Sequence, residues 1–318
     1  MSTYIIRRVV QAIPLLGAIS VALFGLLHLI PGGPEEVALN PMMTEQSRHD
    51  MVVRLGLDQP APVQYVKWLW AALHLDFGSA FADGRPVIVV IGERVPATLE
   101  LLGAAFALAL LLAVPLGVIA AVKQYTLVDH ALTVVSYLGI SMPVFWFAEM
   151  LILGLAIHRR WFPTGGMRTL GAPPSLLDSL HHLVLPAVVV ALVLIAHWSR
   201  YLRASMLEVL HQDYLRTARA KGVGWWRVIM RHALRNALIP LVTVVALDLG
   251  HIFGGAVITE TIFSWPGLGR LFYDSLSSRD YPVLLAMMVL SAVTVVACNL
   301  IADLLYTVLD PRIHYSYP

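Results

Sequence analysis

The sequence predicts an all-α membrane protein with six transmembrane helices. Of its 318 residues, 58% are hydrophobic and only 13% are charged, whereas soluble domains usually carry about 25% charged residues. The mean hydropathy is +0.75. Apolar runs long enough to cross a hydrocarbon core of about 30 Å recur along the chain. The six expected spans are residues 9–30, 97–122, 131–157, 183–202, 238–258 and 283–309.

The first apolar run follows a short basic start that contains Arg7 and Arg8. A signal peptide also combines a basic start with an apolar centre. However, the run leads directly into IPGGPEE, with no small-residue cleavage pattern of the A-x-A kind. We therefore expect a retained first span with its N-terminus inside, as the positive-inside rule favours.

Residues 31–96 are polar and contain eight acids against five bases. Such an acid-leaning loop suits the outer side of the membrane. Within it, residues 64–75 could form an amphipathic helix that lies on the membrane surface or on a partner. The expected organisation is an N-terminal span and outside loop (1–96), a transmembrane core (97–309) and a cytoplasmic tail (310–318).

Several spans contain prolines or charged residues. Pro115 and Pro143 predict kinks, because neighbouring helices can satisfy the backbone groups that a proline frees. Glu149 in the third span and Asp248 with His251 in the fifth are costly in a bilayer and are therefore functional candidates. Asp248 and His251 share a helix face at i, i+3 and could line a polar path. Alternatively, each group pairs with a neighbouring helix for structure alone.

The longest basic segment, residues 212–240, separates the fourth span from the fifth. Asp213 is expected as the N-cap of a helix that begins at Tyr214 and stops at Gly222. A second helix is expected over 225–236, with one apolar face made of Trp226, Ile229, Met230 and Ala233. Any cytoplasmic loop gathers Lys and Arg, so charge alone does not distinguish a docking segment from an ordinary loop.

A second break in the apolar pattern lies at residues 259–286. Pro266, Gly267 and Gly269 interrupt the helix and predict a turn. The aromatic residues around that turn suit a re-entrant or interfacial loop, or simply an aromatic belt; they are Phe263, Trp265, Phe272 and Tyr273.

These segments carry a resemblance to a known family. RTARAKGV followed by RHALRNALIP resembles the cytoplasmic "EAA" loop of ABC-importer permeases of the dipeptide, oligopeptide and nickel branch. TETIFSWPGLGRL with RDYP resembles the same family over many positions, and LGLDQP, LDFGSAF, FPTGG and DPRI follow in the family's order. One departure is Arg216-Thr217-Ala218 where the older consensus opens with Glu-Ala-Ala.

The resemblance implies a type I ABC-importer permease bundle with a coupling loop at 206–237 that docks on an ATPase. The residues expected to dock on the ATPase are Ala218, Gly222, Trp226 and Arg231. The outer gate loop is expected at Trp265, Pro266, Gly267 and Gly269. The residues expected to line a translocation path are Glu149, Asp248 and His251.

The resemblance also implies a set of partners. These are a second homologous permease subunit, one or two ABC ATPase subunits, an extracytoplasmic substrate-binding protein and membrane lipid. A net charge of +2 gives no reason to expect nucleic acid. The sequence has no G-x-x-x-x-G-K-[ST] loop, so ATP and magnesium are expected on the ATPase and no cofactor on this chain. The expected location is the inner membrane of a prokaryote, with both termini cytoplasmic.

The expected function is import of dipeptides or oligopeptides, without catalysis by this chain. One cysteine and scattered histidines and methionines predict no metal site. A permease for nickel or another metal complex is the alternative within the class, since the same architecture serves both. An intramembrane hydrolase using Asp248, His251 and Glu149 is a third reading, and it requires these groups to meet in one pocket. A purely structural membrane scaffold is disfavoured by the glycine- and proline-broken outer loop.

Overall fold

The computed structural model describes residues 2–29, 59–173, 175–250 and 256–309. In this part of the chain the regular structure is helical, apart from an isolated β-bridge between Ser79 and Pro86. The elements, with their bounds, are α1 (Ser2–Leu29), α4 (Ala61–Leu73), α5 (Val87–Val122), α6 (Leu127–Ser141), α7 (Val144–Leu151), η1 (Ile152–His158), α8 (Leu176–Leu210), α9 (Asp213–Ala220), α10 (Trp225–Arg227), η2 (Val228–Ala233), α11 (Leu234–Leu249), α12 (Val257–Ile262), α13 (Leu268–Ser278) and α14 (Tyr281–Leu309).

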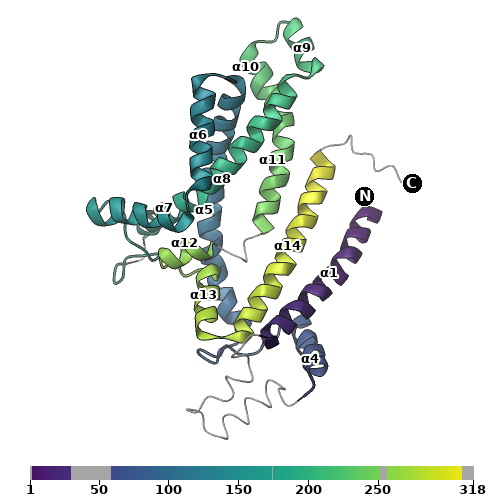
Figure 1. The fold of residues 1–318 in the computed structure, drawn as a ribbon, viewed down its shortest axis with the longest axis vertical. Helices are drawn as coiled ribbons and strands as arrows, with labels where there is room; N and C mark the ends of the chain where they lie inside the picture. Colours follow the sequence, from purple (N-terminus) through teal and green to yellow (C-terminus); the bar gives the residue numbers. More distant parts are fainter. Residues whose placement is uncertain (1, 30–58, 174, 251–255, 310–318) are drawn as a thin grey trace.

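The centre of the bundle is the pair α5 and α8, which pack along one another (Figure 1). Small residues let the two backbones approach closely. A Cβ at Gly117 of α5 would lie 2.9 Å from both Leu202 Cβ and the Ser199 carbonyl oxygen of α8. On the same helix Ala105, Ala109 and Ala113 are fully buried. The long pair therefore forms a rigid core on which the other helices rest.

Described helices lie at all six places where spans are expected. Four are long and apolar enough to cross a membrane: α5, α8, the helix from Trp225 to Leu249, and α14 over Tyr281–Leu304. The bent pair of α6 with α7 and η1 would make a fifth, and α1 contains a shorter apolar stretch, Val10–Leu26. The count of six itself stays a prediction. Helix α5 begins at Val87 and α8 at Leu176, before the expected residues 97 and 183. Apolar residues and good helix formers precede each expected span and lengthen the helix toward its N-terminus.

The third expected span is not one straight helix. Helix α6 ends at Ser141, and the helix over 144–158 leaves at 99° to it. The kink expected at Pro143 is therefore confirmed, although it is a full break. Met142 has the extended ψ of 124°, as expected for the residue before a proline. By contrast, Pro115 lies inside α5 without ending it.

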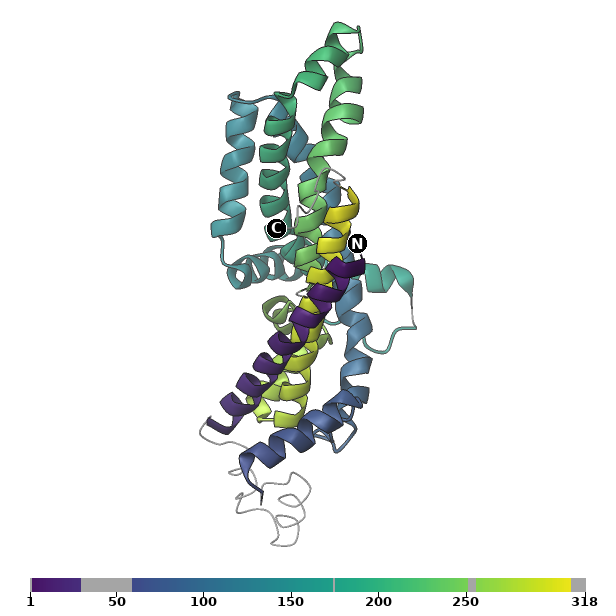
Figure 2. The ribbon, with the colours of Figure 1, turned by 90° about the vertical axis from the view of Figure 1, so that its right-hand side faces the viewer.

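Helices α1 and α14 lie side by side in both ribbon views, with α4 beside the far end of α1 (Figures 1 and 2). Arg8 and Asp303 join α1 to α14 at 3.1 Å. Phe24 of α1 packs edge-on against Tyr65 of α4, with ring centres 5.5 Å apart. The surface helix expected over 64–75 is thus present as α4, and its aromatic side chains bind it to α1.

Candidate functional site

The basic segment folds into one short helix and a tight turn at one end of the molecule (Figure 1). Helix α9 begins at Asp213, and its N-cap is Gln212, with no side-chain cap bond. The expectation that Asp213 is the N-cap is therefore wrong by one residue, because Gln212 already takes the extended backbone that a cap requires. Asp213 instead lies in the first helical turn.

Gly222 ends α9 as expected. Its φ is +81°, a conformation that glycine adopts without a Cβ clash. The Gly222 N–H donates to the Arg219 carbonyl at 2.9 Å, and the Val223 N–H donates to the Ala218 carbonyl at 3.2 Å. These two bonds make a Schellman motif, which satisfies carbonyls at the helix end.

The second helix is continuous with the fifth span. The chain is helical from Trp225 to Leu249, so the expected separation into 225–236 and 238–258 is wrong. No helix-ending signal is strong enough to break it: Pro240 is accommodated inside α11. Six residues of this helix, Val228–Ala233, are wound as a π-helix.

The π turn also changes which side chains are buried. Ile229 and Ala233 are fully buried, but Trp226 is 67% exposed and Met230 is 42% exposed. The single apolar face expected on this helix is therefore wrong, because a π turn shifts the 3.6-residue register on which it was drawn. Leu215 of α9 packs into the same core cluster as Val228 and Ile229. The inner side of this segment is thus anchored to the bundle.

The outer side of the segment is exposed, basic and aromatic. We call it the basic end: Arg216, Arg219, Lys221, Trp225, Trp226 and Arg227, all exposed. The Arg219 guanidinium carbon lies 4.0 Å from the Trp225 ring centre, a cation–π contact that presents both groups together. Arg231 is also exposed, while Ala218 is half-buried. Of the predicted docking residues, Gly222 and Trp226 lie directly at this end.

At the other end, a buried carboxyl joins α12 to α13 and to α5. Glu260 is fully buried. Its Oε1 accepts from the Thr98 hydroxyl at 2.9 Å, and its Oε2 accepts from the Arg270 N–H at 3.0 Å. The Thr98 hydroxyl oxygen in turn accepts from the Leu268 N–H at 2.7 Å. Sequence reasoning missed Glu260 as a site residue, although it lies at the start of the stretch TETIFSWPGLGRL that carries the resemblance.

Two opposing effects act on the pKa of Glu260, which lies outside the candidate spans. Burial raises the pKa of the carboxyl, because a low-dielectric environment penalises the charged form. Hydrogen bonds from Arg270 N–H, Thr98 hydroxyl and Gly269 N–H oppose that rise. The balance lies on the raised side. This carboxyl is therefore held by its donors at a cost in desolvation.

The glycines of the predicted gate loop are required by close packing. A Cβ at Gly267 would lie 2.5 Å from both the Glu260 carboxyl carbon and Thr98 Oγ1. A Cβ at Gly269 would lie 2.7 Å from Val257 Cα. The backbone of Gly267 has φ −97°, which any residue can adopt. The turn is confirmed, and its glycines make room for a carboxyl and a crossing helix.

The aromatic residues Phe263 and Trp265 do not form an interfacial belt. They are 1% and 0% exposed, so the belt reading is wrong for these two. Trp265 Nε1 donates to the Ala97 carbonyl of α5 at 2.8 Å. The neighbouring Pro266 carbonyl accepts from Arg94 at 3.5 Å. The rings of Phe263 and Trp265 thus fill the junction between the α12–α13 hairpin and the bundle. Trp265 can be buried there because the α5 backbone supplies an acceptor for its indole N–H.

The expected path residues fall in different places. Asp248 accepts a 2.7 Å bond from Trp198 Nε1, which links α11 to α8. Exposed Glu149 borders a cavity of about 940 Å³ that Arg168 and Arg270 also line, and Asp248 does not line it. His251 lies outside the described residues. The hydrolase reading required these groups to converge, and the described part of the chain shows no such meeting of Glu149 with Asp248.

A buried ion pair joins α6 to α8. Arg203 donates from Nε and Nη2 to the two Asp129 carboxylate oxygens at 2.7 and 2.8 Å. The Asp129 side chain is 3% exposed. Such a two-point contact is strong and directional. The partners are 74 residues apart, so no spacing rule in the sequence could have indicated them.

Metal ligands do not cluster in the part of the chain that the structure describes. No group of three or more His, Cys, Asp or Glu residues there is placed to hold a metal ion. His181 and His182 instead bond to loop carbonyls, at 2.6 Å to Trp161 and 3.0 Å to Gly165.

The bundle, the basic end and the buried hairpin can be compared with known proteins. The family described as "Binding-protein-dependent transport system inner membrane component" matches residues 113–315. The family of the corresponding N-terminal segment matches residues 1–102. The chain therefore belongs to the binding-protein-dependent transport system inner membrane components, a class of multi-pass membrane proteins.

Similar proteins cover the chain almost from end to end. The chain is 45% identical to the oligopeptide transport system permease protein AppB of Bacillus subtilis, over 99% of this chain and 100% of AppB. It is 39% identical to the dipeptide transport system permease protein DppB of Escherichia coli K12, over 99% of this chain and 100% of DppB. A probable peptide ABC transporter permease of Sinorhizobium fredii is 40% identical over 99% of this chain and all of its own length.

A solved structure shares the fold. A chain of the MetNI methionine ABC transporter, in an inward-facing conformation, superposes with a TM-score of 0.55 over 70% of this chain and 97% of that one. The sequences are 16% identical, so this likeness shows the fold alone. The bundle therefore has the fold of that chain.

Proposed function

We propose that this chain is a permease subunit of an ABC importer that moves dipeptides or oligopeptides across the inner membrane. The observation that carries this is end-to-end similarity: relatives 45% and 39% identical over 99% of the chain are named oligopeptide and dipeptide permeases. Energy comes from ATP and magnesium on a separate ATPase subunit. The chain itself catalyses no reaction and binds no cofactor.

The basic end is the surface that meets the ATPase. Gly222 sets the turn that places α9 against the partner, and exposed Trp226 supplies apolar area to be buried there. Arg231 meets acids on the ATPase, and half-buried Ala218 keeps α9 close to the bundle. Because Trp226 lies in the first turn of a helix that runs from Trp225 to Leu249, motion of the docked surface is carried directly into the fifth span.

The outer end controls access to the path. The hairpin of Trp265, Pro266, Gly267 and Gly269 is the outer gate, and Glu260 fixes it to α5. Glu149 and Asp248 contact the polar route at separate points, and His251, which lies outside the described residues, is proposed as a third path residue. A half-path needs a second half, so the complex contains a second homologous permease.

The remaining parts of the proposal concern the assembly. One or two ATPase subunits dock on the inner side, and an extracytoplasmic substrate-binding protein docks on the outer side. Both termini and the basic end lie in the cytoplasm, which places α4 and the α12–α13 hairpin outside. Figure 1 is consistent with this arrangement, because the basic end and the hairpin lie at opposite ends of the bundle.

The test is purification of the complex from native membranes, with uptake of a labelled dipeptide into reconstituted vesicles. Trp226→Asp, alone and with Gly222→Pro, is expected to release the ATPase and abolish uptake while the membrane protein stays folded. Trp226 is exposed, so Trp226→Asp alone leaves the fold intact. Leu127→Asp, at an exposed position in the first turn of α6 where a helix favours an acid, controls for a general effect of a new charge. If no ATPase purifies with the unmodified chain, or if vesicles accumulate nickel but no peptide, the proposal is wrong.

A further inference from the structure

Two arginines on neighbouring turns of α8 have different surroundings. Arg203 is neutralised by the two-point contact with Asp129. Arg200 is exposed, and its guanidinium carbon lies 4.4 Å from the Tyr137 ring centre. It also donates to the Tyr137 hydroxyl at 3.4 Å. Among the described residues, no carboxylate lies within ion-pair distance of Arg200.

The uncompensated charge lies on a helix that is long and apolar enough to cross a membrane. Arg200 is ten residues before the end of α8 at Leu210. It stacks on Tyr137 of α6, which is ten residues beyond the start of that helix at Leu127. A charged side chain within a membrane-spanning helix rarely faces lipid and usually faces a polar cavity or path.

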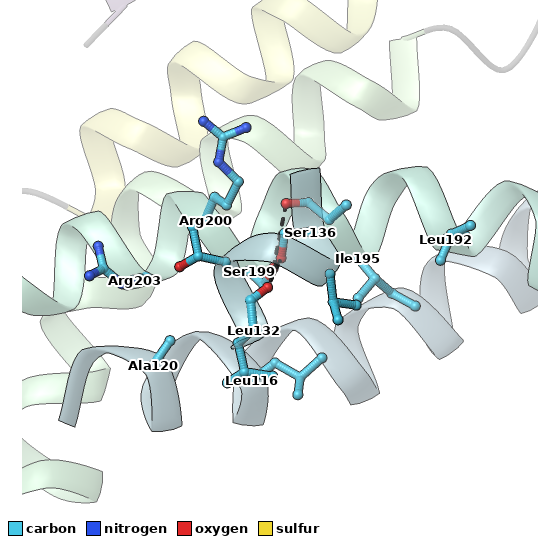
Figure 3. A pocket seen from close by; sticks show the side chains of 12 residues that line it. Leu116, Ala120, Leu132, Ser136, Leu192, Ile195, Ser199, Arg200 and Arg203 are labelled. Atoms are coloured by element: carbon cyan, nitrogen blue, oxygen red, sulfur yellow. Dashed lines mark hydrogen bonds between the residues drawn. The ribbon is translucent and has the colours of Figure 1, made fainter. Parts of the chain in front are cut away.

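The charge borders an open pocket. A cavity of about 440 Å³ lies between α6 and α8. We call it the inner cationic pocket, lined by Tyr137, His197, Arg200 and Tyr201 among others. These four side chains are exposed, and the His197 and Tyr201 rings lie 4.9 Å apart. Figure 3 shows that Arg200 points away from the α5 residues Leu116 and Ala120.

The chemistry of this pocket fits a carboxylate. A guanidinium presents parallel N–H donors that match the two oxygens of a carboxylate, and stacking on a ring fixes its plane. Tyrosine hydroxyls and an imidazole add further donors. Every linear peptide carries a C-terminal carboxylate whatever its side chains are. A path that binds this group can therefore accept many sequences.

We propose that the inner cationic pocket holds the C-terminal carboxylate of a peptide during its passage. Arg200 binds the carboxylate, and Tyr137 is a positioning residue that holds the guanidinium plane. This inference rests on the proposed peptide import. An anionic lipid headgroup carries a similar charge, and measuring bound lipid together with peptide uptake distinguishes the two ligands.

The experiment uses the complete transport complex in vesicles with its binding protein and a radiolabelled dipeptide bearing a photoreactive side chain. Crosslinks formed during ATP turnover are mapped on this chain. The variants are Arg200→Gln and Arg200→Lys, with Arg7→Gln as a control that removes an exposed arginine from α1. Subunit composition and stimulated ATP hydrolysis are measured in each sample.

The unmodified complex is expected to import the peptide and to be labelled in α6 or α8 beside the pocket. Arg200→Gln should lower both labelling and uptake about tenfold or more, which is typical for loss of a hydrogen-bonded charge partner. ATP hydrolysis should remain, because the basic end is unchanged. Arg200→Lys should restore part of the uptake, since it keeps the charge but loses the fork. Arg7→Gln should behave like the unmodified complex.

Several results would overturn the inference while the proposed function stands. They are peptide uptake with labelling only elsewhere, unchanged uptake in Arg200→Gln, and loss of the second permease subunit from Arg200→Gln, which would make Arg200 an interface residue. Loss of a bound anionic lipid with normal uptake would assign the pocket to lipid. If the unmodified complex imports no peptide, the proposed function itself fails.

Discussion

Glu260 shows how one buried carboxyl can organise a whole hairpin. Its two oxygens accept from α5 and from the first turn of α13. The N-terminus of α13 adds a favourable dipole for the negative charge. The resulting contact fixes α12, α13 and α5 relative to one another. Aromatic packing without these hydrogen bonds would not fix the relative positions of the three helices, because apolar contacts are not directional.

Replacing Glu260 with glutamine should destabilise this junction. An amide has one acceptor oxygen, whereas three donors approach the carboxyl, from Thr98, Arg270 and Gly269. A buried donor left without an acceptor costs about 1–3 kcal/mol. The measurement is the thermal unfolding midpoint of the purified complex, together with protease cleavage of the hairpin. Glu100→Gln, at an exposed position on α5, should change stability by less than about 0.5 kcal/mol. Equal effects of the two changes would contradict the assigned role.

Gly267→Ala tests the close packing around the same carboxyl. The added Cβ would fall 2.5 Å from Thr98 Oγ1 and the Glu260 carboxyl carbon, so the hairpin must shift. Overpacking of this kind costs about 1–3 kcal/mol. Gly103→Ala is the matched control, since a Cβ there meets nothing within 4 Å on α5. We expect peptide uptake to fall for Gly267→Ala and to stay normal for Gly103→Ala. A normal uptake rate in both would show that the gate tolerates the shift.

Among the secondary-structure elements, α9 and its turn are mostly exposed, with Leu215 as the buried residue of α9, yet their geometry is strict. The Schellman bonds end α9 and direct the chain back toward Trp225. The helix that starts there continues without a loop to Leu249. If the basic end docks on the ATPase as proposed, a single helix connects the docked surface to the Trp198–Asp248 bond between α11 and α8.

Gly222→Ala should weaken coupling without removing any exposed side chain. The φ of +81° costs an alanine about 1–2 kcal/mol in that conformation. The neighbouring Gly224 has φ −58°, and a Cβ there meets nothing within 4 Å, so Gly224→Ala is the control. We expect ATPase recovery in co-purification to fall for Gly222→Ala only. If both variants retain the ATPase equally, the turn geometry does not limit docking.

At the level of the entire bundle, two polar contacts hold helices that the apolar cores alone would leave free to slide. Asp129–Arg203 joins α6 to α8, and Trp198–Asp248 joins α8 to α11. Helix α8 is thus tied by polar contacts to α6 and to α11, in addition to its packing against α5. The inner cationic pocket lies beside the first of these ties.

Breaking the Asp129–Arg203 pair should loosen α6. Arg203→Gln leaves the Asp129 carboxylate buried without its charged partner, at a cost of about 2–3 kcal/mol. The expected result is a lower unfolding midpoint of the complex and faster hydrogen exchange in α6. Arg85→Gln removes an arginine from a pair with Glu93 in which both side chains are exposed, so it should change stability by less than about 1 kcal/mol. An equal fall of the unfolding midpoint in both variants would show that the burial of Asp129 does not make its ion pair more important for stability.

The sequence predicted most of the architecture because its signals are local. Apolar runs, Pro143 and Gly222 each act within a few residues, and the spans, the kink and the end of α9 follow from them. Its errors lie where a neighbouring segment changes a local preference. The π turn after Arg227 removed the expected apolar face, and the backbone of α5 drew Trp265 into the interior.

Hydropathy by itself predicted a helical membrane protein, since partitioning into a membrane depends on composition. The resemblance of its short motifs indicated the family, which the comparisons then showed. The contacts of Glu260, Arg203 and Arg200 come from residues many turns or whole helices apart, and no sequence period connects them. Their geometry exists only once α5, α6 and α8 have packed, because small residues set how closely those backbones approach. The polar interior of this protein is therefore a property of helix packing.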